Sequence, residues 1–262
     1  MGLIKAAIGD AVLTFMWVFC ASTLGAVTSI IASASGVQGM ATLFITTVLV
    51  FILLLVFGII GDALGGASFN PTGTAAFYAA GASSDSLFSM ALRFPAQAAG
   101  AVSGALAIAE VMPMQYKNML GGPSLKVDLH IGAAAEGVLT FIITFAVLLI
   151  VLRGPRSPVV KTWLLAMSTV ALVVTGSNYT GPSMNPANCL WLGICKQPAQ
   201  HMGAVLCLLD LPLYRSNIGC MGFPYSLSSP NKGEESLKRP KRISLIVICV
   251  NEDNSPLGLF AA

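Results

Sequence analysis

Five long apolar runs constrain this chain more than any other feature of its sequence. They cover residues 8–32, 40–61, 87–111, 132–152 and 159–177. The hydrocarbon core of a bilayer is about 30 Å thick, so a helix needs about 20 apolar residues to cross it. A helix also satisfies its own backbone hydrogen bonds, as lipid requires. The runs therefore predict an all-α membrane protein that contacts the lipid bilayer.

The composition argues against a large soluble helical core. Hydrophobic residues make up 55% of the chain and charged residues only 10%, against about 25% charged residues in a soluble domain. The net charge of +3 is too small to indicate nucleic-acid binding, and we interpret the basic run at 238–242 as a solvated tail. No nucleophile, base and orienting group occur together, and no cysteine pair has metal-ligand spacing. We therefore expect no enzyme activity, no cofactor and no metal site.

Basic residues predict the orientation of the spans. Lys5 precedes the first run, while Arg153, Arg156 and Lys161 lie at the connection between the fourth and fifth. On an alternating path both places fall on one side of the membrane. Because lysine and arginine are enriched in cytoplasmic loops, this side is predicted to be the cytoplasm, and the N-terminus with it.

Two Asn-Pro pairs precede apolar pieces that are too short to span. SFNPTG at 68–73 leads into a predicted half-helix over 70–81, and SMNPAN at 183–188 contains the start of a second one at 185–188. Asparagine is a strong helix N-cap, and proline fits the first helical position. Each pair is therefore predicted to start a re-entrant half-helix.

The chain also contains an internal repeat. GDAVLTF at 9–15 and AEGVLTF at 135–141 each carry an acid four positions before threonine, and each heads a half that later reaches an Asn-Pro pair. Three spans separate the two starts, so the second half enters the membrane upside down. Such inverted repeats place a transport site at the bilayer midplane. The matched pairs are Asp10 with Thr14 and Glu136 with Thr140.

Acids inside a span are costly and are usually functional or paired. We expect Asp10 and Glu136 to face the bundle interior and to accept hydrogen bonds from the backbone of the re-entrant loops. The alternative role is a proton relay, for which one matched pair without a histidine in a span is a poor basis.

Two half-helices inserted from opposite faces would bring two positive helix ends together. Asn70 and Asn185 would then point amide donors at a passing oxygen, while the helix dipoles contribute about half a charge at each start. This field repels cations and protons, and a neutral molecule passes by exchanging hydrogen bonds. The pattern therefore favours a passive channel.

These features resemble the aquaporin, or major intrinsic protein, family over residues 5–188. The first box, Asn70-Pro71-Thr72, replaces the usual Asn-Pro-Ala, whereas the second, Asn185-Pro186-Ala187, keeps it. With the short N-terminus and few charges, the variant box is similar to that of the plant small basic intrinsic proteins. The resemblance implies water conduction, an endoplasmic reticulum membrane and a homo- or hetero-tetramer.

The same resemblance implies a selectivity constriction. Counting from the boxes, its positions fall at Val50, Val173, Pro182 and Asn188, the last in place of a usual arginine. Such a ring is apolar and lacks a fixed cation, so we expect weaker discrimination by charge than in a relative with arginine. The alternatives are plain helix packing for Val50 and Val173 and a loop-shaping role for Pro182. Thr72 is expected to narrow the midplane or to make a local hydrogen bond.

After Asn188 the sequence changes character, and a sixth span is expected to be missing or disrupted. The best apolar window, 202–213, is short and contains Asp210 and Pro212. Permitted codons allow a one-base slip at Cys189 that restores YWICPFIGA, which mirrors RFPAQAAGA at 93–101. We therefore interpret 189–262 as an aberrant tail that arises from a frame slip.

The sequence predicts a channel domain at 1–188 that conducts water or another small neutral solute across an intracellular membrane. Two alternatives remain: a non-conducting truncated subunit, and a secondary transporter, because inverted repeats and broken helices serve both channels and transporters.

Overall fold

The computed structural model describes residues 2–189, and every regular element in that range is helical. The helices are α1 (Leu3–Ala21), α2 (Leu24–Ser35), α3 (Met40–Ala63), α4 (Pro71–Ala79), α5 (Leu87–Val111), α6 (Met114–Lys117), α7 (Leu129–Arg153) and α8 (Pro158–Gly176). A further helical turn begins at Pro186 and is described as far as Cys189. The expected sixth span and nearly all of the expected aberrant tail lie outside the described residues.

Five helical segments of the described part are long and apolar enough to cross a membrane. They are α1 with α2, then α3, α5, α7 and α8. Many of their large apolar side chains face outward, as Ile4, Phe44 and Ile59 do with exposed fractions of 72%, 62% and 63%. An outward apolar surface suits lipid as the surrounding solvent. The prediction of an all-α membrane fold is confirmed.

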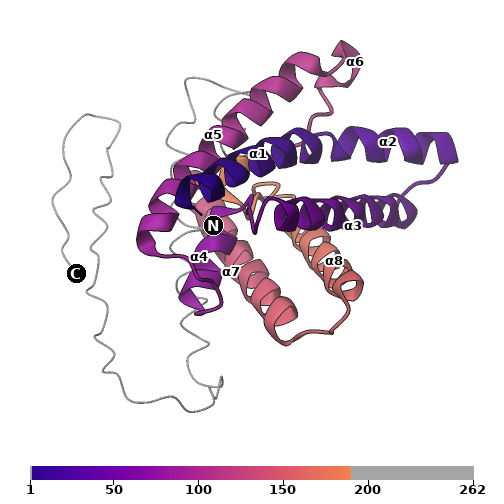
Figure 1. Cartoon of the computed structure of the whole chain (residues 1–262). Helices are drawn as coiled ribbons and strands as arrows, with labels where there is room; N and C mark the ends of the chain where they lie inside the picture. The colour runs from indigo at the N-terminus through magenta and orange to yellow at the C-terminus, as the bar shows by residue number, and fades with distance from the viewer. Residues whose placement is uncertain (1, 190–262) are drawn as a thin grey trace, which may run out of the picture. The chain divides into compact units, whose positions relative to one another are not determined.

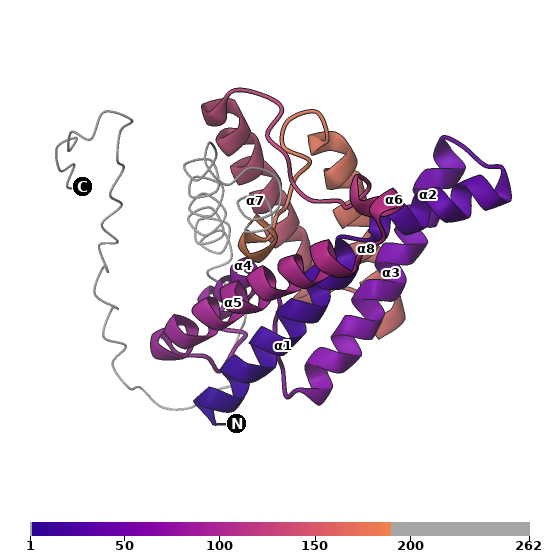
Figure 2. The same ribbon diagram turned by 90° about the horizontal axis from the view of Figure 1, so that it is seen from above.

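The first expected span, 8–32, is not one continuous helix. It divides into α1 and α2 at Ser22 and Thr23, and the two helices continue in line beside α3 (Figures 1 and 2). The hydroxyls of Ser22 and Thr23 each donate back to a carbonyl of the preceding turn, at 2.7 Å. The Ser22 carbonyl instead accepts from the Gly121 N–H at 2.8 Å. Local hydroxyl bonds of this kind compete with the helical ladder, which explains the interruption.

The most extensive helix packing joins α1 to α5, and Figure 2 shows the two running side by side. Two glycines of α5 allow this close approach. A Cβ atom added at Gly100 would overlap the Ala11 carbonyl, and one at Gly104 would lie 3.2 Å from the carbonyl carbon of Phe15. Small residues at such contacts let two backbones come together. The packing fixes α1, which carries the first buried acid.

The remaining elements surround the two Asn-Pro boxes. The short helix α4 packs against α5 and α7, while α8 packs against α3 and α7. The loop before α7 pairs with the segment after α8 through backbone bonds from Ser124 to Thr180 and from Lys126 to Tyr179, at 2.7 and 2.9 Å. This pairing holds the segment that leads to the second box.

Candidate functional site

Each asparagine of the two boxes caps the helix that follows it. The Asn70 Oδ1 atom accepts from the Thr72 N–H at 3.0 Å, and Pro71 occupies the first turn of α4. In the second box, Asn185 Oδ1 accepts from the Ala187 N–H at 3.0 Å, and helix begins at Pro186. The two helix starts therefore have the same construction, as the sequence predicts from N-cap chemistry.

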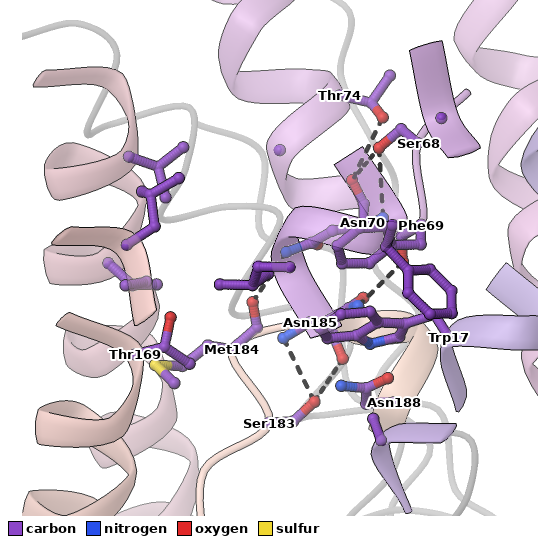
Figure 3. A pocket seen from close by; sticks show the side chains of 18 of the residues that line it. Trp17, Ser68, Phe69, Asn70, Thr74, Thr169, Ser183, Met184, Asn185 and Asn188 are labelled. Atoms are coloured by element: carbon purple, nitrogen blue, oxygen red, sulfur yellow. Dashed lines mark hydrogen bonds between the residues drawn. The ribbon is translucent and has the colours of Figure 1, made fainter. Parts of the chain in front are cut away.

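The two boxes are also bound to each other. Asn70 Nδ2 donates to the carbonyl of Met184 at 3.3 Å, and Asn185 Nδ2 donates to the carbonyl of Phe69 at 2.9 Å (Figure 3). Each asparagine thus bonds to the residue that precedes the other. The crossed bonds bring the two helix starts together within the protein.

A serine two residues before each asparagine stiffens the approach to the box. The Ser68 and Ser183 hydroxyls each donate to the carbonyl of their own asparagine and accept from its N–H, the latter at 3.3 Å in both boxes. The second box carries an additional constraint, because Met184 has a φ of 50°. A non-glycine residue in this left-handed region is strained and persists only when its surroundings hold it.

The two buried acids hold the loops in front of the boxes. Asp10 Oδ1 accepts from the Ser68 N–H at 2.8 Å. Glu136 Oε1 accepts from the N–H groups of Ser183 and Met184 at 3.0 and 2.7 Å, and Glu136 Oε2 accepts from the Thr180 hydroxyl at 3.0 Å. Both acids have an exposed fraction of 0%. Their oxygens therefore bond to loop backbone, and Glu136 retains the strained Met184.

The two threonines that follow these acids in the sequence repeat have a different environment. Thr14 and Thr140 are fully buried, and neither hydroxyl finds a partner among the described residues. The matched pairs of the sequence repeat are therefore not hydrogen-bonded acid–threonine pairs.

A buried cation lies beside Asp10, and the sequence alone did not identify it as a site residue. Arg93 of α5 donates from Nε to Asp10 Oδ2 at 2.7 Å and from Nη2 to Asp10 Oδ1 at 2.9 Å. Gln97 Nε2 adds a bond to Asp10 Oδ2 at 2.7 Å. An arginine inside an apolar span was the available signal, since such a charge needs a buried partner.

Arg93 also reaches the two loops at its end of the molecule. Its Nη2 donates to the Gly66 carbonyl at 3.2 Å, and its Nη1 donates to Asp85 Oδ2 at 2.8 Å. Gly66 has a φ of 83°, a conformation that favours glycine. Burial raises the pKa of Asp85, but hydrogen bonds from Ser83, Ser89 and Arg93 outweigh it and leave the pKa below its usual range.

A cavity of about 1480 Å³ runs past the two boxes, and both Asn70 and Asn185 line it. The four expected constriction residues, Val50, Val173, Pro182 and Asn188, line it as well. Val50 also packs in a buried cluster with Ala166 and Val170, so it contributes to helix packing as well as to the cavity wall.

The other box residues do not line this cavity, whose described wall omits Pro71, Thr72, Pro186 and Ala187. Thr72 has an exposed fraction of 1%, and its hydroxyl has no partner among the described residues. The expectation that Thr72 narrows the passage or makes a local hydrogen bond therefore finds no support in this part of the chain. The cap geometry explains the difference, because it directs the asparagine side chains, and not the residues after them, toward the opposite box.

Within residues 2–189, no group of three or more His, Cys, Asp or Glu side chains is placed to hold a metal ion. The two cysteines of this range, Cys20 and Cys189, are free thiols. The cavity wall beside the two boxes contributes amides, hydroxyls and an indole, and the described wall also includes the charged residues Asp62, Asp85 and Arg93.

Comparisons with known proteins agree with this geometry. The family model described as major intrinsic protein matches residues 1–196. Aquaporin SIP1-2 of Zea mays is 64% identical over 186 residues, which cover 71% of this chain and 76% of that relative. Aquaporin SIP1-1 of Oryza sativa subsp. japonica is 63% identical over 190 residues, covering 71% and 77%. Aquaporin SIP1-1 of Arabidopsis thaliana is 57% identical over 189 residues, covering 71% and 78%.

One solved structure shows the same fold. The X-ray structure of the aquaglyceroporin from Plasmodium falciparum aligns with a TM-score of 0.63 and 18% sequence identity. The alignment covers 85% of this chain and 96% of that one.

Proposed function

Because the chain belongs to the major intrinsic protein family and is a multi-pass membrane protein and aquaporin-family channel, we propose that it conducts water and small neutral solutes passively across an intracellular membrane. The observation that carries this proposal is the crossed bonding of Asn70 and Asn185 beside the cavity. Each side-chain amide has two N–H bonds, so each keeps a second donor for a passing oxygen.

The helix starts supply the selectivity against charge. Aligned peptide dipoles place about half a positive charge at each start, which repels cations and protons. A neutral oxygen-bearing molecule accepts hydrogen bonds from the asparagine amides. These bonds replace the ones that it makes in bulk water. With Asn188 in place of an arginine, proton exclusion rests mainly on these two helix ends.

The membrane context is part of the proposal. We place the protein in the endoplasmic reticulum membrane, as the resemblance to the plant small basic intrinsic proteins implies. The positions of Lys5, Arg153, Arg156 and Lys161 support a cytoplasmic N-terminus. The exposed apolar side chains of the described helices suit contact with lipid and with neighbouring subunits of a homo- or hetero-tetramer. No cofactor takes part in this passive function.

A secondary transporter would need titrating acids at the midplane, and the geometry disfavours this rival. Asp10 is held by Arg93 and Gln97, and both Asp10 and Glu136 bond to loop backbone. These bonds fix both carboxylates in place, and neither acid is among the described residues that line the cavity. The second rival, a non-conducting subunit, differs from the proposal only in permeability.

Stopped-flow swelling of vesicles that contain the purified full chain tests the proposal. We expect faster swelling than in empty vesicles without any proton gradient, and a loss of this gain in Asn185→Asp, which keeps the capping oxygen but removes both amide donors. Asn178→Asp is the matched control, because Asn178 lies exposed in a turn outside the cavity wall. A requirement for a proton gradient would favour the transporter, and equal swelling with empty vesicles would favour the non-conducting subunit.

A further inference from the structure

Trp17 of α1 is a large aromatic residue in the cavity wall that the proposed mechanism leaves unused. Its ring stacks on Phe69 with centroids 4.0 Å apart and planes at 15°, and it meets the edge of Phe57 at 5.4 Å and 82°. Figure 3 shows the stack beside the two boxes. Two aromatic contacts of this geometry fix the plane of the indole and therefore the direction of its N–H bond.

The indole nitrogen has no hydrogen-bond partner among the described residues, although the Nε1 atom is buried. A buried tryptophan N–H usually has a partner, because a donor removed from water is otherwise destabilising. The indole is a donor only. The missing partner must therefore be an acceptor.

Asn188 carries a hydrogen-bond acceptor that lacks a donor in the described part of the chain. Its Oδ1 atom is buried and accepts from no described group. Trp17 and Asn188 line the same cavity, and Trp17 packs against a buried cluster that includes Ala187, the neighbour of Asn188. The wall thus holds an unpartnered donor and an unpartnered acceptor next to the second box.

Building on the proposed channel function, we propose that Trp17 is a specificity-determining residue that binds a permeating hydroxyl together with Asn188. The Trp17 N–H donates to the oxygen of water or of a small alcohol, and the same O–H group donates to Asn188 Oδ1. A hydroxyl carries out both roles on one oxygen. A metal cation or ammonium cannot accept from the indole, and an anion without a proton cannot donate to the amide oxygen.

The location of this pair connects it to the boxes. Phe69, against which the indole stacks, accepts from Asn185 Nδ2 through its carbonyl at 2.9 Å. A hydroxyl held at Trp17 is therefore beside the asparagine donors that receive it next. The pair selects neutral hydroxyl-bearing molecules without a fixed cation, in the region where Asn188 replaces the usual arginine.

The test uses vesicles that contain the full chain, with water and glycerol as probes. Trp17→Phe removes the N–H and keeps an aromatic ring for the stack, so we expect permeability to fall about two- to tenfold, the range of one neutral hydrogen bond. Trp163→Phe is the matched control, because Trp163 packs against Phe51 and is absent from the cavity wall. Adding Asn188→Leu to Trp17→Phe should lower permeability by much less than Asn188→Leu does alone, because both residues bind one hydroxyl.

A second readout is independent of conduction. In a Trp163→Phe/Trp191→Phe variant, Trp17 is the remaining tryptophan, and the indole N–H vibrational band reports its bonding. We expect a hydrogen-bonded band that shifts on dehydration. A free N–H band, or a band that moves with Asn188→Leu but not with dehydration, would overturn the inference.

The two failures are distinguishable. If the unmodified chain conducts and Trp17→Phe matches it, the Trp17 inference is wrong while the channel proposal stands. If the unmodified chain swells no faster than empty vesicles, the channel proposal fails, and the vibrational band alone decides whether Trp17 binds a hydroxyl.

Discussion

Arg93 donates a hydrogen bond to each carboxylate oxygen of Asp10, with Nε 2.7 Å from Oδ2 and Nη2 2.9 Å from Oδ1. The Arg93 side chain is 7% exposed and the Asp10 side chain 0%. Glu136, the repeat counterpart of Asp10, is held among the described residues by neutral donors alone. The first half of the repeat is therefore clamped by an ion pair, and the second by hydrogen bonds from its own loop.

Breaking this pair should destabilise the protein strongly. We expect Arg93→Met to lower the free energy of unfolding by about 3–5 kcal/mol, because it leaves a buried carboxylate without its counter-charge. Arg93→Lys should recover only part of the loss, since an ammonium lacks the planar fork that contacts both oxygens. Denaturant titration in detergent measures the effect. Arg156→Met, in an exposed loop, is the control, and equal unfolding midpoints for Arg93→Met and Arg156→Met would refute the assignment.

The contact between α1 and α5 predicts a size limit at Gly104. Gly104→Val should cost about 1–3 kcal/mol of stability, because the added carbons meet the Phe15 backbone, which has no free rotamer to move away. Gly58→Val is the matched control, since nothing lies within 4 Å of the Cβ position at Gly58 in α3. Melting temperatures of the two variants check this, and a smaller loss at Gly104 than at Gly58 would contradict the packing.

The Asp85 contacts predict an acid-dependent stability. The pKa of Asp85 is lowered in the folded protein, so the unfolded chain takes up the proton first. The stabilisation is complete above the unfolded carboxyl pKa of about 3.9 and is lost as the pH falls through the lower folded pKa. Asp85→Asn should therefore melt below the unmodified protein at pH 7, with a gap that closes toward pH 3. A gap of constant size over this range would mean that Asp85 acts without its charge.

Restoring a fixed cation should change charge discrimination. We expect Asn188→Arg to reduce the leak of small monovalent cations roughly tenfold, the factor that corresponds to 1.4 kcal/mol of added repulsion. The measurement is dye-reported cation flux into vesicles, beside water permeability of the same preparation. Asn178→Arg places the same charge in an exposed turn and should leave the leak unchanged. An unchanged leak in Asn188→Arg would show that this position does not face the permeating ion.

The frame-slip interpretation of residues 189–262 makes a prediction at the level of the gene. Matches to the SIP1 relatives cover 71% of this chain and 76–78% of theirs. Part of this chain and part of each relative therefore remain unaligned. Genomic DNA and transcripts read across codon 189 should contain a one-base difference that restores a sixth apolar span. A well-supported frame that encodes the printed tail would exclude the slip.

Local chemistry explains which parts of the structure were predictable from sequence. The five spans and the capping by Asn70 and Asn185 depend on run length and on residues within one helical turn, both of which can be read along the chain. The α1–α2 interruption was not anticipated, because the apolar run continues through Ser22 and Thr23 and the acceptor role of Ser22 depends on Gly121, far away in sequence.

The buried acids beside the boxes were predictable from the sequence, but the side chains that contact them were not. Asp10 and Glu136 were identified because an acid in an apolar run is costly and recurs at matching places. Arg93, Gln97 and Trp17 acquire their roles only from tertiary neighbours, so their positions in the sequence indicate burial but not partners. Thr72 shows the opposite case, because membership of a motif did not place its side chain in the cavity.

The crossed bonds between the boxes also set an order for biosynthesis. Asn70 finds its acceptor 114 residues later in the chain, at Met184. At about 5–20 residues per second, a ribosome needs roughly 6–23 s to make that stretch. During this interval the side-chain amide of Asn70 lacks its Met184 acceptor. The bond from Asn70 to the second box therefore forms only late in translation. A chain that stops before Met184 lacks the acceptor of the Asn70 amide.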